Sequence, residues 1–258
     1  MKNIHKTAII SPKAELDENI MIGPYCIIGD HVKISKGTEL VSHIQIEGKT
    51  EIGQNCKIFP FTIIGFPPQD TKYNGEPTGV KIGNNNIIRE YTTIHRASVS
   101  GEGWTVVGDN NFIMAYVHIA HDCNIGNSVI IANLATLAGH VLVEDCVFIG
   151  GLVAVHQFTR IGAYAMIGGF SGIGQDIPPF TMASGPRAKL YGLNSVGLKR
   201  RGFSDETINI LKKAYKILFR DKLTLKEAIN KIKKTLPPIP EIKHLLDFIE
   251  VNKRGICR

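Results

Sequence analysis

The chain has 258 residues, of which 43% are hydrophobic and 21% charged, and its formal net charge is +7. This ordinary charge content, with a mean hydropathy of +0.03, excludes an intrinsically disordered chain. No apolar run is long enough to span a bilayer, and the N-terminus lacks the apolar core of a signal peptide, so we expect a soluble, cytoplasmic protein.

The charge is unevenly distributed along the chain. Residues 191–258 contain 16 Lys and Arg against 7 Asp and Glu, whereas residues 1–190 are nearly neutral. A basic segment suits nucleic acid, a membrane surface or an acidic protein, and its sign alone does not choose between them. The 5 cysteines show no CxxC spacing, which indicates reduced thiols in the core of a cytosolic protein.

A six-residue repeat of aliphatic residues dominates the sequence from Ile4 onward. This period fits neither an amphipathic helix nor a long two-faced strand, and it predicts a solenoid of short strands with tight turns that glycine eases. We expect each large aliphatic residue, and the small or β-branched residue four positions after it, to point inward. The aliphatic row runs through Ile10, Leu16, Ile22, Ile28, Ile34, Leu40, Ile46, Ile52, Ile58 and Ile64, then Ile82, Ile88 and Ile94, and from Val107 at every sixth residue to Ile173.

The repeat resembles that of left-handed parallel β-helix proteins, in which three hexads make one triangular coil. On this resemblance, residues 4–178 form a mainly β structure of roughly ten coils, stacked about 4.8 Å apart. Residues 65–79 (GFPPQDTKYNGEPTG) and 97–106 (ASVSGEGWTV) break the repeat. We predict that both are loops and that function concentrates there, because a regular solenoid does not need them.

The pattern becomes helical after the last hexads. Ser204 is a good N-cap for one helix, and residues 224–227 (TLKE) form a capping box that opens another. A further helix is predicted near residues 241–251, after a proline-rich break. The sequence therefore predicts two domains, a left-handed parallel β-helix over residues 1–190 and a small α-helical domain over residues 191–258.

The repeat also predicts which polar side chains meet, because residues eighteen apart lie above one another on neighbouring coils. Asp122 stacks under His140, and His121 stacks under Gly139. The loop at 97–106 takes the place of the preceding coil on this face and forms one wall. Four of the 9 histidines of the chain are among the outward polar residues gathered there. The full set is His118, His121, Asp122, His140, His156 and Gln157.

Two chemistries fit this cluster, which is too dense for a chance surface group. Histidines on adjacent coils can hold zinc, with a water completing the tetrahedron. Alternatively, His121 is a general base whose ring is oriented by the carboxylate of Asp122. In that case the backbone N–H of Gly139, one coil away, is placed to stabilise an oxyanion.

An ordered set of motifs resembles the UDP-N-acetylglucosamine O-acyltransferase family of hexapeptide-repeat acyltransferases, whose reaction is the first step of lipid A biosynthesis. The resemblance covers essentially the whole chain, from solenoid through helical tail. The hexads alone are weak evidence, since many acyltransferases share them, whereas this ordered set is highly specific. The motifs are residues 68–73 (PQDTKY), 118–123 (HIAHDC), 137–140 (LAGH), 156–158 (HQF) and 197–203 (GLKRRGF).

The resemblance implies direct transfer of a 3-hydroxyacyl group from acyl carrier protein to the 3-hydroxyl of UDP-N-acetylglucosamine. In this reaction His121 removes the hydroxyl proton, Asp122 supports the imidazolium, and the Gly139 N–H stabilises the tetrahedral oxyanion. It also implies a homotrimer with its sites between subunits and a reaction without cofactor or metal. The partner of the basic tail is then an acidic carrier protein rather than nucleic acid.

The resemblance assigns further residues to substrate contacts. Asp70 and Lys72, with His118, position the sugar or the acyl donor. The cleft is lined by Gln69, His140, His156 and Gln157. The nucleotide and its diphosphate are contacted by Asn194, Arg200 and Arg201.

The sequence departs from the family pattern at two positions. Val196 stands where the family often has an acidic nucleotide contact, and Arg187 stands where some members have histidine near the acyl donor. The region that sets acyl length lies near Met166 and Gly169. Because Gly169 leaves the groove open, we expect a long acyl chain.

Three alternatives remain open at this stage. A zinc hydratase of the γ-carbonic-anhydrase type needs three converging metal ligands but not the basic tail. The related N-acyltransferase of lipid A assembly carries a domain before its solenoid, whereas the repeat here begins at Ile4. A structural solenoid without activity leaves the histidine cluster unexplained.

Overall fold

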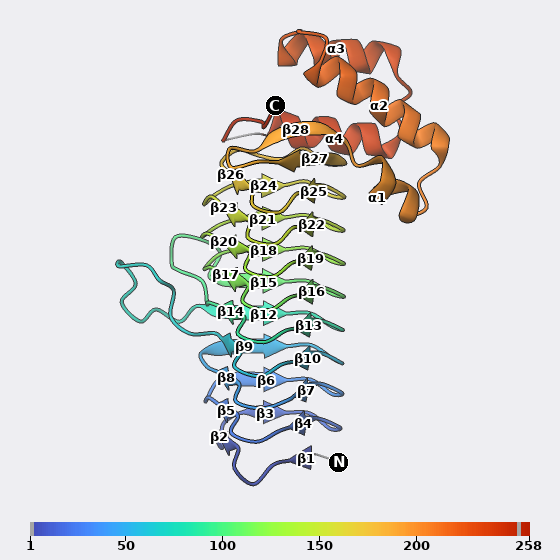
Figure 1. Cartoon of the computed structure of the whole chain (residues 1–258). Helices are drawn as coiled ribbons and strands as arrows, with labels where there is room; N and C mark the ends of the chain where they lie inside the picture. The colour runs from blue at the N-terminus through green and yellow to red at the C-terminus, as the bar shows by residue number, and fades with distance from the viewer. Residues whose placement is uncertain (1–2, 252–253) are drawn as a thin grey trace.

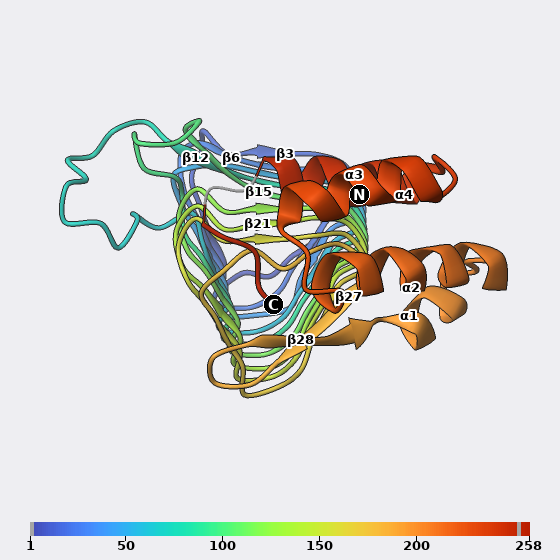
Figure 2. The same ribbon diagram turned by 90° about the horizontal axis from the view of Figure 1, so that it is seen from above.

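The computed structural model describes residues 3–251 and 254–258 and shows a triangular prism with a helical unit at its C-terminal end (Figure 1). The view along the prism shows three walls of stacked strands (Figure 2). The fold is a left-handed parallel β-helix followed by α-helices, as the hexad repeat and the resemblance predicted.

The three walls are called sheets A, B and C. Sheet A contains β1 (Asn3–Ile4), β4 (Met21–Ile22), β7 (Glu39–Leu40), β10 (Lys57–Ile58), β13 (Ile87–Ile88), β16 (Phe112–Ile113), β19 (Ile130–Ile131), β22 (Phe148–Ile149), β25 (Met166–Ile167), β27 (Thr181–Ser184) and β28 (Lys189–Leu193). Sheet B contains β2 (Ile9–Ile10), β5 (Ile27–Ile28), β8 (Gln45–Ile46), β11 (Ile63–Ile64), β14 (Thr93–Ile94), β17 (His118–Ile119), β20 (Thr136–Leu137), β23 (Ala154–Val155) and β26 (Gly172–Ile173). Sheet C contains β3 (Glu15–Leu16), β6 (Val32–Ile34), β9 (Lys49–Ile52), β12 (Gly79–Ile82), β15 (Trp104–Val107), β18 (Asn124–Ile125), β21 (Leu142–Val143) and β24 (Arg160–Ile161).

The register confirms the eighteen-residue stacking on which the cluster was predicted. Ile119 of β17 pairs with Leu137 of β20, which pairs with Val155 of β23. Their side chains are at most 3% exposed and belong to one continuous apolar core. Each such burial contributes roughly 1.5–3 kcal/mol, so the inward row holds the coils together.

The small inward slot is filled as expected. Cys26, Cys56 and Cys123 are buried in this position, and the cysteines of the described residues are free thiols. Burial raises the pKa of the Cys123 thiol to about 12, so the thiolate needed of a nucleophile is not formed near neutral pH.

The corners of the prism are tight turns in which one residue has a positive φ. At the corner between sheets B and C, which we call corner BC, Asp122 and His140 have φ of 59° and 60°. Asparagine and aspartate tolerate this left-handed conformation better than most residues. The same turn recurs on the next coil at Phe158, with φ of 62°, and therefore aligns the side chains of these three successive corners.

Both predicted loops emerge at corner BC, on the left of Figure 1. The first connects β11 to β12 and the second connects β14 to β15. The second loop is shorter than the expected 97–106, because β15 already begins at Trp104. Trp104–Val107 pair in parallel with Gly79–Ile82 over four residues. The regular wall therefore extends into the segment that was predicted to be irregular.

The C-terminal unit contains one helix more than the sequence predicted. Ser204 caps α2, and Thr224 with Glu227 forms the predicted capping box of α3. The additional helix is short and capped by Asn194. Strand β28 crosses the domain boundary expected at residues 190 and 191. The helices are α1 (Ser195–Arg200), α2 (Asp205–Phe219), α3 (Leu225–Thr235) and α4 (Pro240–Glu250).

The helical unit is fixed to the prism by buried polar contacts. The carboxylate of Asp176, which is 0% exposed, accepts from the backbone N–H of Arg160 at 2.9 Å and from its guanidinium Nε at 2.9 Å. Arg160 also donates to the Phe248 carbonyl of α4 at 2.8 Å. In the part of the chain described, none of the helices has the length and apolar character that crossing a bilayer requires.

Candidate active site

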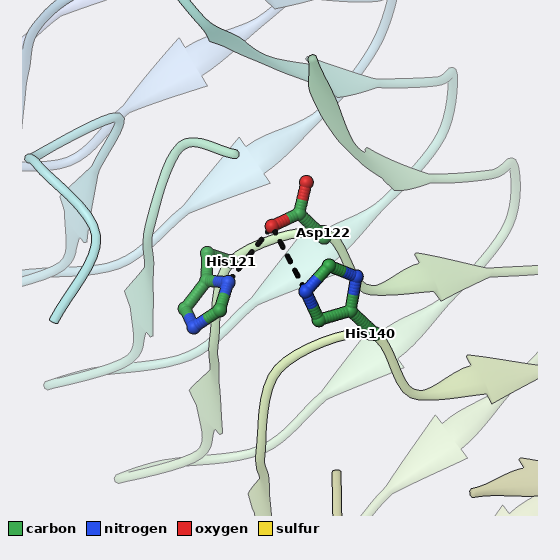
Figure 3. Close-up of side chains that lie close together, drawn as sticks. All are labelled: His121, Asp122 and His140. Carbon is green, nitrogen blue, oxygen red and sulfur yellow. Dashed lines mark hydrogen bonds and ion pairs between the residues drawn. The ribbon is translucent and has the colours of Figure 1, made fainter. Parts of the chain in front are cut away.

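His121 and Asp122 form a close pair at corner BC (Figure 3). The Nδ1 atom of His121 lies 2.8 Å from Oδ2 of Asp122. An ionised carboxylate only accepts hydrogen bonds, so Nδ1 carries the proton and Nε2 of the neutral ring keeps its lone pair. The pair therefore presents the basic nitrogen that a general base requires.

Asp122 is enclosed by the second loop. Its side chain is 3% exposed, and Oδ2 accepts from the N–H of Ser98 at 3.0 Å and from the Ser98 hydroxyl at 2.6 Å. Burial raises the pKa of the Asp122 carboxyl, but the hydrogen bonds from His121 and Ser98 outweigh burial and leave the pKa lowered. Asp122 is therefore a stable anion beneath the imidazole.

His140 approaches the same carboxylate from the next coil, as predicted. Its Nε2 lies 3.6 Å from Oδ2 of Asp122, and its ring stacks on Phe158 with centroids 4.4 Å apart. Burial lowers the pKa of His140, although the Asp122 charge opposes this shift. His140 is therefore neutral near pH 7.

Gly139 lies directly against the His121 ring. A Cβ at position 139 would lie 2.5 Å from Cε1 and 2.8 Å from Nε2 of His121, so only glycine fits without displacing the ring. Within the described residues, the Gly139 N–H donates no hydrogen bond to a protein acceptor. A free donor beside the imidazole is the arrangement that an oxyanion hole requires.

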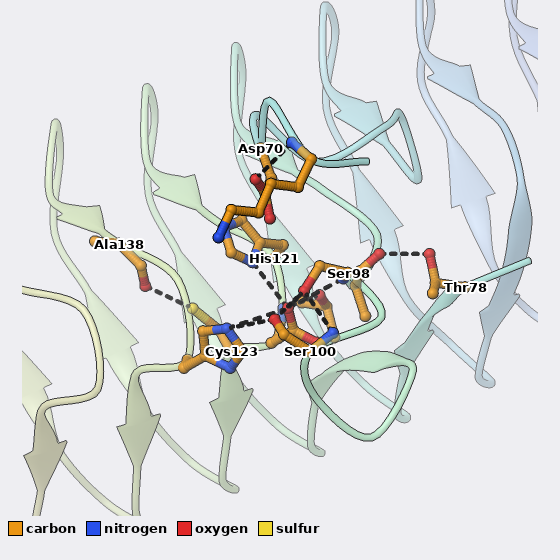
Figure 4. A network of polar contacts seen from close by, with 12 residues as sticks. Asp70, Thr78, Ser98, Ser100, His121, Cys123 and Ala138 are labelled. Atoms are coloured by element: carbon orange, nitrogen blue, oxygen red, sulfur yellow. Dashed lines mark hydrogen bonds and ion pairs between the residues drawn. The ribbon is translucent and has the colours of Figure 1, made fainter. Parts of the chain in front are cut away.

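A pocket of about 520 Å³ opens above the pair, between the two loops and the coils. Six of the predicted site residues line it, and the labelled Asp70 and His121 lie close together in Figure 4. Sequence reasoning missed several other lining residues, among them Ser98 and Ser100, because loop residues follow no period. The predicted residues in the lining are Gln69, Asp70, Lys72, His121, His140 and Gln157.

The other predicted histidines, His118 and His156, are not in the lining of this pocket. His118 on β17 accepts or donates a hydrogen bond with the Thr93 hydroxyl at 2.7 Å and meets His95 edge to face at 5.1 Å. Burial lowers the pKa of His118 and lowers that of His95 to about 4. His156 lines a neighbouring pocket of about 500 Å³. His95 was missed, although extending the stack one coil back through the loop would have found it.

The predicted nucleotide contacts lie at a different corner of the prism. Arg201 donates to the Ser128 carbonyl, 3.4 Å away, at the corner between sheets C and A. The Asn194 side chain donates to the Tyr164 carbonyl at 2.9 Å and accepts from the Gly197 N–H at 3.1 Å. Figures 1 and 2 both place α1, which carries Arg200, on the side of the prism away from the loops. One chain does not bring these residues to the His121 pocket.

The remaining predicted positions lie near the C-terminal end of the prism. Met166 is in β25 and Gly169 is in the following turn, where a Cβ would lie 3.2 Å from the Gly151 carbonyl oxygen. Arg187 lines the same pocket as His156. Val196 is 65% exposed on α1 and is absent from the linings of the two pockets described above.

The cluster also satisfies the distance requirement of a metal site. One donor atom each from His121, Asp122 and His140 lie within 4.8 Å of one another. In the structure two of these atoms, Nδ1 of His121 and Oδ2 of Asp122, are joined by a hydrogen bond. The geometry is therefore compatible with zinc binding as well as with acid–base chemistry.

Known proteins resemble this chain over its whole length. A family model described as "Udp N-acetylglucosamine O-acyltransferase; Domain 2" matches residues 176–257, and "Bacterial transferase hexapeptide (six repeats)" matches residues 105–139. The acyl-[acyl-carrier-protein]--UDP-N-acetylglucosamine O-acyltransferase of Thermodesulfovibrio yellowstonii is 84% identical over 258 residues, covering 100% of both chains. The chain belongs to the UDP-N-acetylglucosamine O-acyltransferase family.

The similarity to this O-acyltransferase family extends over sequence and structure. The corresponding enzyme of Herminiimonas arsenicoxydans is 50% identical over 262 residues, with 100% of both chains covered. The solved structure of LpxA from Acinetobacter baumannii has a TM-score of 0.96 and 47% identity and covers 99% of both chains. The resemblance inferred from the motifs is thus confirmed, and the chain is an acyltransferase enzyme.

Proposed function

We propose that this enzyme transfers a 3-hydroxyacyl group from acyl carrier protein to the 3-hydroxyl of UDP-N-acetylglucosamine, the first step of lipid A biosynthesis. The observation that carries the proposal is the pair of His121 and Asp122 beneath the 520 Å³ pocket, in a chain that belongs to this family. The reaction takes place in the cytoplasm, where the carrier protein supplies the thioester.

The chemical step is a direct attack on the thioester. Nε2 of His121 takes the proton of the sugar 3-hydroxyl as the oxygen forms a bond to the acyl carbonyl carbon. The negative charge moves to the carbonyl oxygen, where the Gly139 N–H stabilises it. As the tetrahedral intermediate collapses, the C–S bond breaks and the imidazolium returns its proton to the departing thiolate. Asp122 stabilises the imidazolium throughout.

The loop residues bind the reactants above this pair. Lys72 and Asp70 position the sugar or the acyl donor, and Gln69 lines the wall of the pocket. From the coils, Gln157 and His140 line the cleft, and we assign further substrate contacts to His118 and His156. No metal takes part in this mechanism.

The nucleotide is held by a second copy of the chain. Asn194, Arg200 and Arg201 lie at another corner from His121, so a site that uses both needs two subunits. A homotrimer satisfies this requirement, because closed cyclic symmetry places the same pair of surfaces together at each interface. The guanidinium groups then form charge-assisted hydrogen bonds with the diphosphate.

The acyl chain passes Met166 and Gly169 in this arrangement. Because glycine leaves the groove open, we propose that the enzyme prefers long chains. Transfer rates with carrier-protein thioesters of increasing length test this point, and a preference for short chains would reject it. The exposed Val196 and the arginine at position 187 are expected to alter nucleotide and donor affinity rather than the chemical step.

The test of the proposed function is a transfer assay on the purified protein. UDP-N-acetylglucosamine and its 3-amino analogue are offered with 3-hydroxyacyl and unsubstituted acyl carrier protein thioesters. We expect ester product from the first sugar with a 3-hydroxyacyl donor, unchanged after treatment with a chelator. Activity that requires stoichiometric zinc, or hydration of carbon dioxide in place of transfer, would establish the metal chemistry that the three donor atoms allow.

A further inference from the structure

The loop between β14 and β15 contributes two serines that contact the histidine pair from outside the coils, as Figure 4 shows for Ser98, Ser100 and His121. Ser98 is 2% exposed, and its Oγ lies 2.6 Å from Oδ2 of Asp122. Its backbone N–H donates to the same oxygen at 3.0 Å. None of the reactions described above uses this residue.

The positions of the protons follow from the chemistry of the acceptor. Because Asp122 is ionised and can only accept, the Ser98 hydroxyl donates its one proton to Oδ2. The Ser98 oxygen then accepts from the Ser100 hydroxyl, 2.7 Å away. Ser100 has only lone pairs left for Nε2 of His140, 3.3 Å away, so this nitrogen of His140 carries a proton.

The same carboxylate oxygen receives the proton of His121 Nδ1. Ser98 and His121 therefore share one acceptor, and the position of that oxygen sets the orientation of the imidazole. The other oxygen, Oδ1 of Asp122, is buried and has no hydrogen-bond partner among the described residues. A Cβ at Gly101 would lie 2.2 Å from it, so the loop closes over the carboxylate at van der Waals distance.

The loop is itself held rigidly. The Thr78 hydroxyl, at the end of the first loop, donates to the Ala97 carbonyl, and Ala97 is 0% exposed. The Gly79 N–H donates to the Gly103 carbonyl at 2.9 Å. Both ends of the 97–103 segment are thus hydrogen-bonded to residues 78–79 at the start of β12, and Ser98 is presented to Asp122 from a constrained backbone.

We propose that Ser98 is a positioning residue for the reaction, which holds the Asp122 carboxylate in the orientation that keeps it hydrogen-bonded to Nδ1 of His121. The inference rests on the proposed function, because it assigns Ser98 to the general-base pair of that reaction. Ser98 acts through Asp122 and touches no reacting atom.

The first test compares Ser98→Ala with Ser98→Thr in the transfer assay. We expect Ser98→Ala to lower kcat by about ten- to a hundredfold, the usual effect of removing a residue that orients a catalytic ligand, with KM for the sugar nucleotide unchanged within about twofold. Ser98→Thr keeps the hydroxyl and should restore most of kcat. Ser100→Ala removes the donor to Ser98 and the acceptor for Nε2 of His140 but leaves the bond between Ser98 and Asp122, so it should have a smaller effect than Ser98→Ala.

The matched control is Thr62→Val, which removes another buried hydroxyl, at the corner between sheets A and B rather than at corner BC. Thr62 is 0% exposed and donates to the Phe59 carbonyl at 2.8 Å. It should retain wild-type kcat. Thermal unfolding of the variants separates loss of folded protein from loss of turnover.

The second test needs no substrate and therefore separates this inference from the proposed function. Diethyl pyrocarbonate modifies unprotonated imidazole, so the rate of His121 modification against pH, followed by peptide mass spectrometry, reports its protonation. The titratable groups around His121 are Asp122 and His140 at the corner, His118 of β17 and His95 directly after β14, and Asp70 of the first loop in turn faces His140. In Ser98→Ala the carboxylate loses a donor and stabilises the imidazolium more strongly. We expect the midpoint of modification, and the acid limb of the rate profile, to move to higher pH.

The outcomes that overturn the inference are specific. The first is a Ser98→Ala variant with wild-type kcat and an unmoved modification midpoint. The second is a Ser98→Ala variant whose KM rises while its kcat is unchanged. The third is a Ser98→Thr variant as impaired as Ser98→Ala. If the wild-type protein itself transfers no acyl group, the proposed function fails, and the modification midpoint alone decides whether Ser98 orients the pair.

Discussion

Asp122 directly follows His121 in the chain, yet its carboxylate oxygen Oδ2 lies 2.8 Å from the Nδ1 atom of that histidine. Adjacent residues in a strand point to opposite faces and do not meet in this way. The contact exists because Asp122 occupies the positive-φ position of the corner turn, with φ of 59°. The corner geometry of the β-helix therefore builds the pair from two consecutive residues.

The general-base assignment predicts a specific loss on removing the imidazole. His121→Ala should lower kcat by about 10²–10⁴-fold, because general base catalysis contributes this much, while the protein stays folded. Turnover and thermal unfolding measure the two effects. The control is His5→Ala, which removes an exposed imidazole near the N-terminus and should leave turnover unchanged. Wild-type turnover in His121→Ala would refute the assignment.

Gly139 is expected to tolerate no side chain. In Gly139→Ala the new Cβ overlaps the His121 ring, so the ring must move away from Asp122 or the coils must separate. We predict a fall in kcat of about a hundredfold, the usual cost of disturbing an oxyanion donor and its neighbouring base.

Gly174→Ala is the matched control for this substitution, since its Cβ would have nothing within 4 Å and its backbone is not left-handed. Steady-state kinetics of both variants test the prediction. Equal kcat in Gly139→Ala and wild type would show that the ring has room that the structure does not give it.

The division of the site between two corners predicts complementation between defective subunits. We expect two variants, His121→Ala and the double variant Arg200→Ala/Arg201→Ala, each to be inactive by itself at low sugar nucleotide concentration. When the two are co-expressed and assemble randomly, about a quarter of the interfaces pair an intact His121 with intact arginines, so about a quarter of the activity should return.

Transfer activity of the purified mixed oligomers measures this recovery. Lys222→Ala, mixed with His121→Ala, serves as the reference, because Lys222 lies beyond α2 and belongs to no part of the site. Activity of the double-arginine mixture no higher than the sum of its separate components would mean that each site lies within one chain.

The contact between His244 of α4 and Glu144 of the prism makes the thermal stability of the protein depend on pH. Nε2 of His244 lies 2.7 Å from Oε2 of Glu144, and this hydrogen bond raises the pKa of His244. Because the pKa of His244 is higher in the folded state, the contact contributes fully to the free energy of unfolding below the unfolded pKa of about 6.5. This contribution is lost as pH rises through the higher folded pKa. We expect wild type to melt about 1–3 °C above His244→Gln at pH 5, since the pair is partly exposed.

This advantage should shrink at pH values above the folded pKa. Melting temperatures of both proteins across pH 5 to 9 provide the measurement, and Glu144→Gln should behave like His244→Gln. A difference that grows with pH would show that the neutral imidazole, not the imidazolium, docks α4 on the prism.

The regular part of the molecule was predictable because its information is local and repeated. One hexad determines an inward aliphatic residue, an inward small residue and a turn, and stacking then follows at eighteen residues. The meeting of Asp122 with His140 follows from this period alone, and the structure confirms it, with Nε2 of His140 3.6 Å from Oδ2 of Asp122.

The irregular part was not predictable in the same way. An insertion has no period, so the sequence located the second loop without showing that Ser98 would close over Asp122 or that β15 would begin at Trp104. The short helix α1 was missed for a related reason, because six residues carry too little amphipathic pattern to distinguish a helix from a charged turn.

The sequence by itself thus determined the prism, its core, the histidine stack and the family motifs, since each depends on residue type at a fixed spacing. Only the tertiary structure decided how the loop encloses the carboxylate, and that Arg201 lies at another corner from His121. Those relations join segments separated by irregular stretches of chain, where distance in space is set by packing and hydrogen bonding rather than by a repeat.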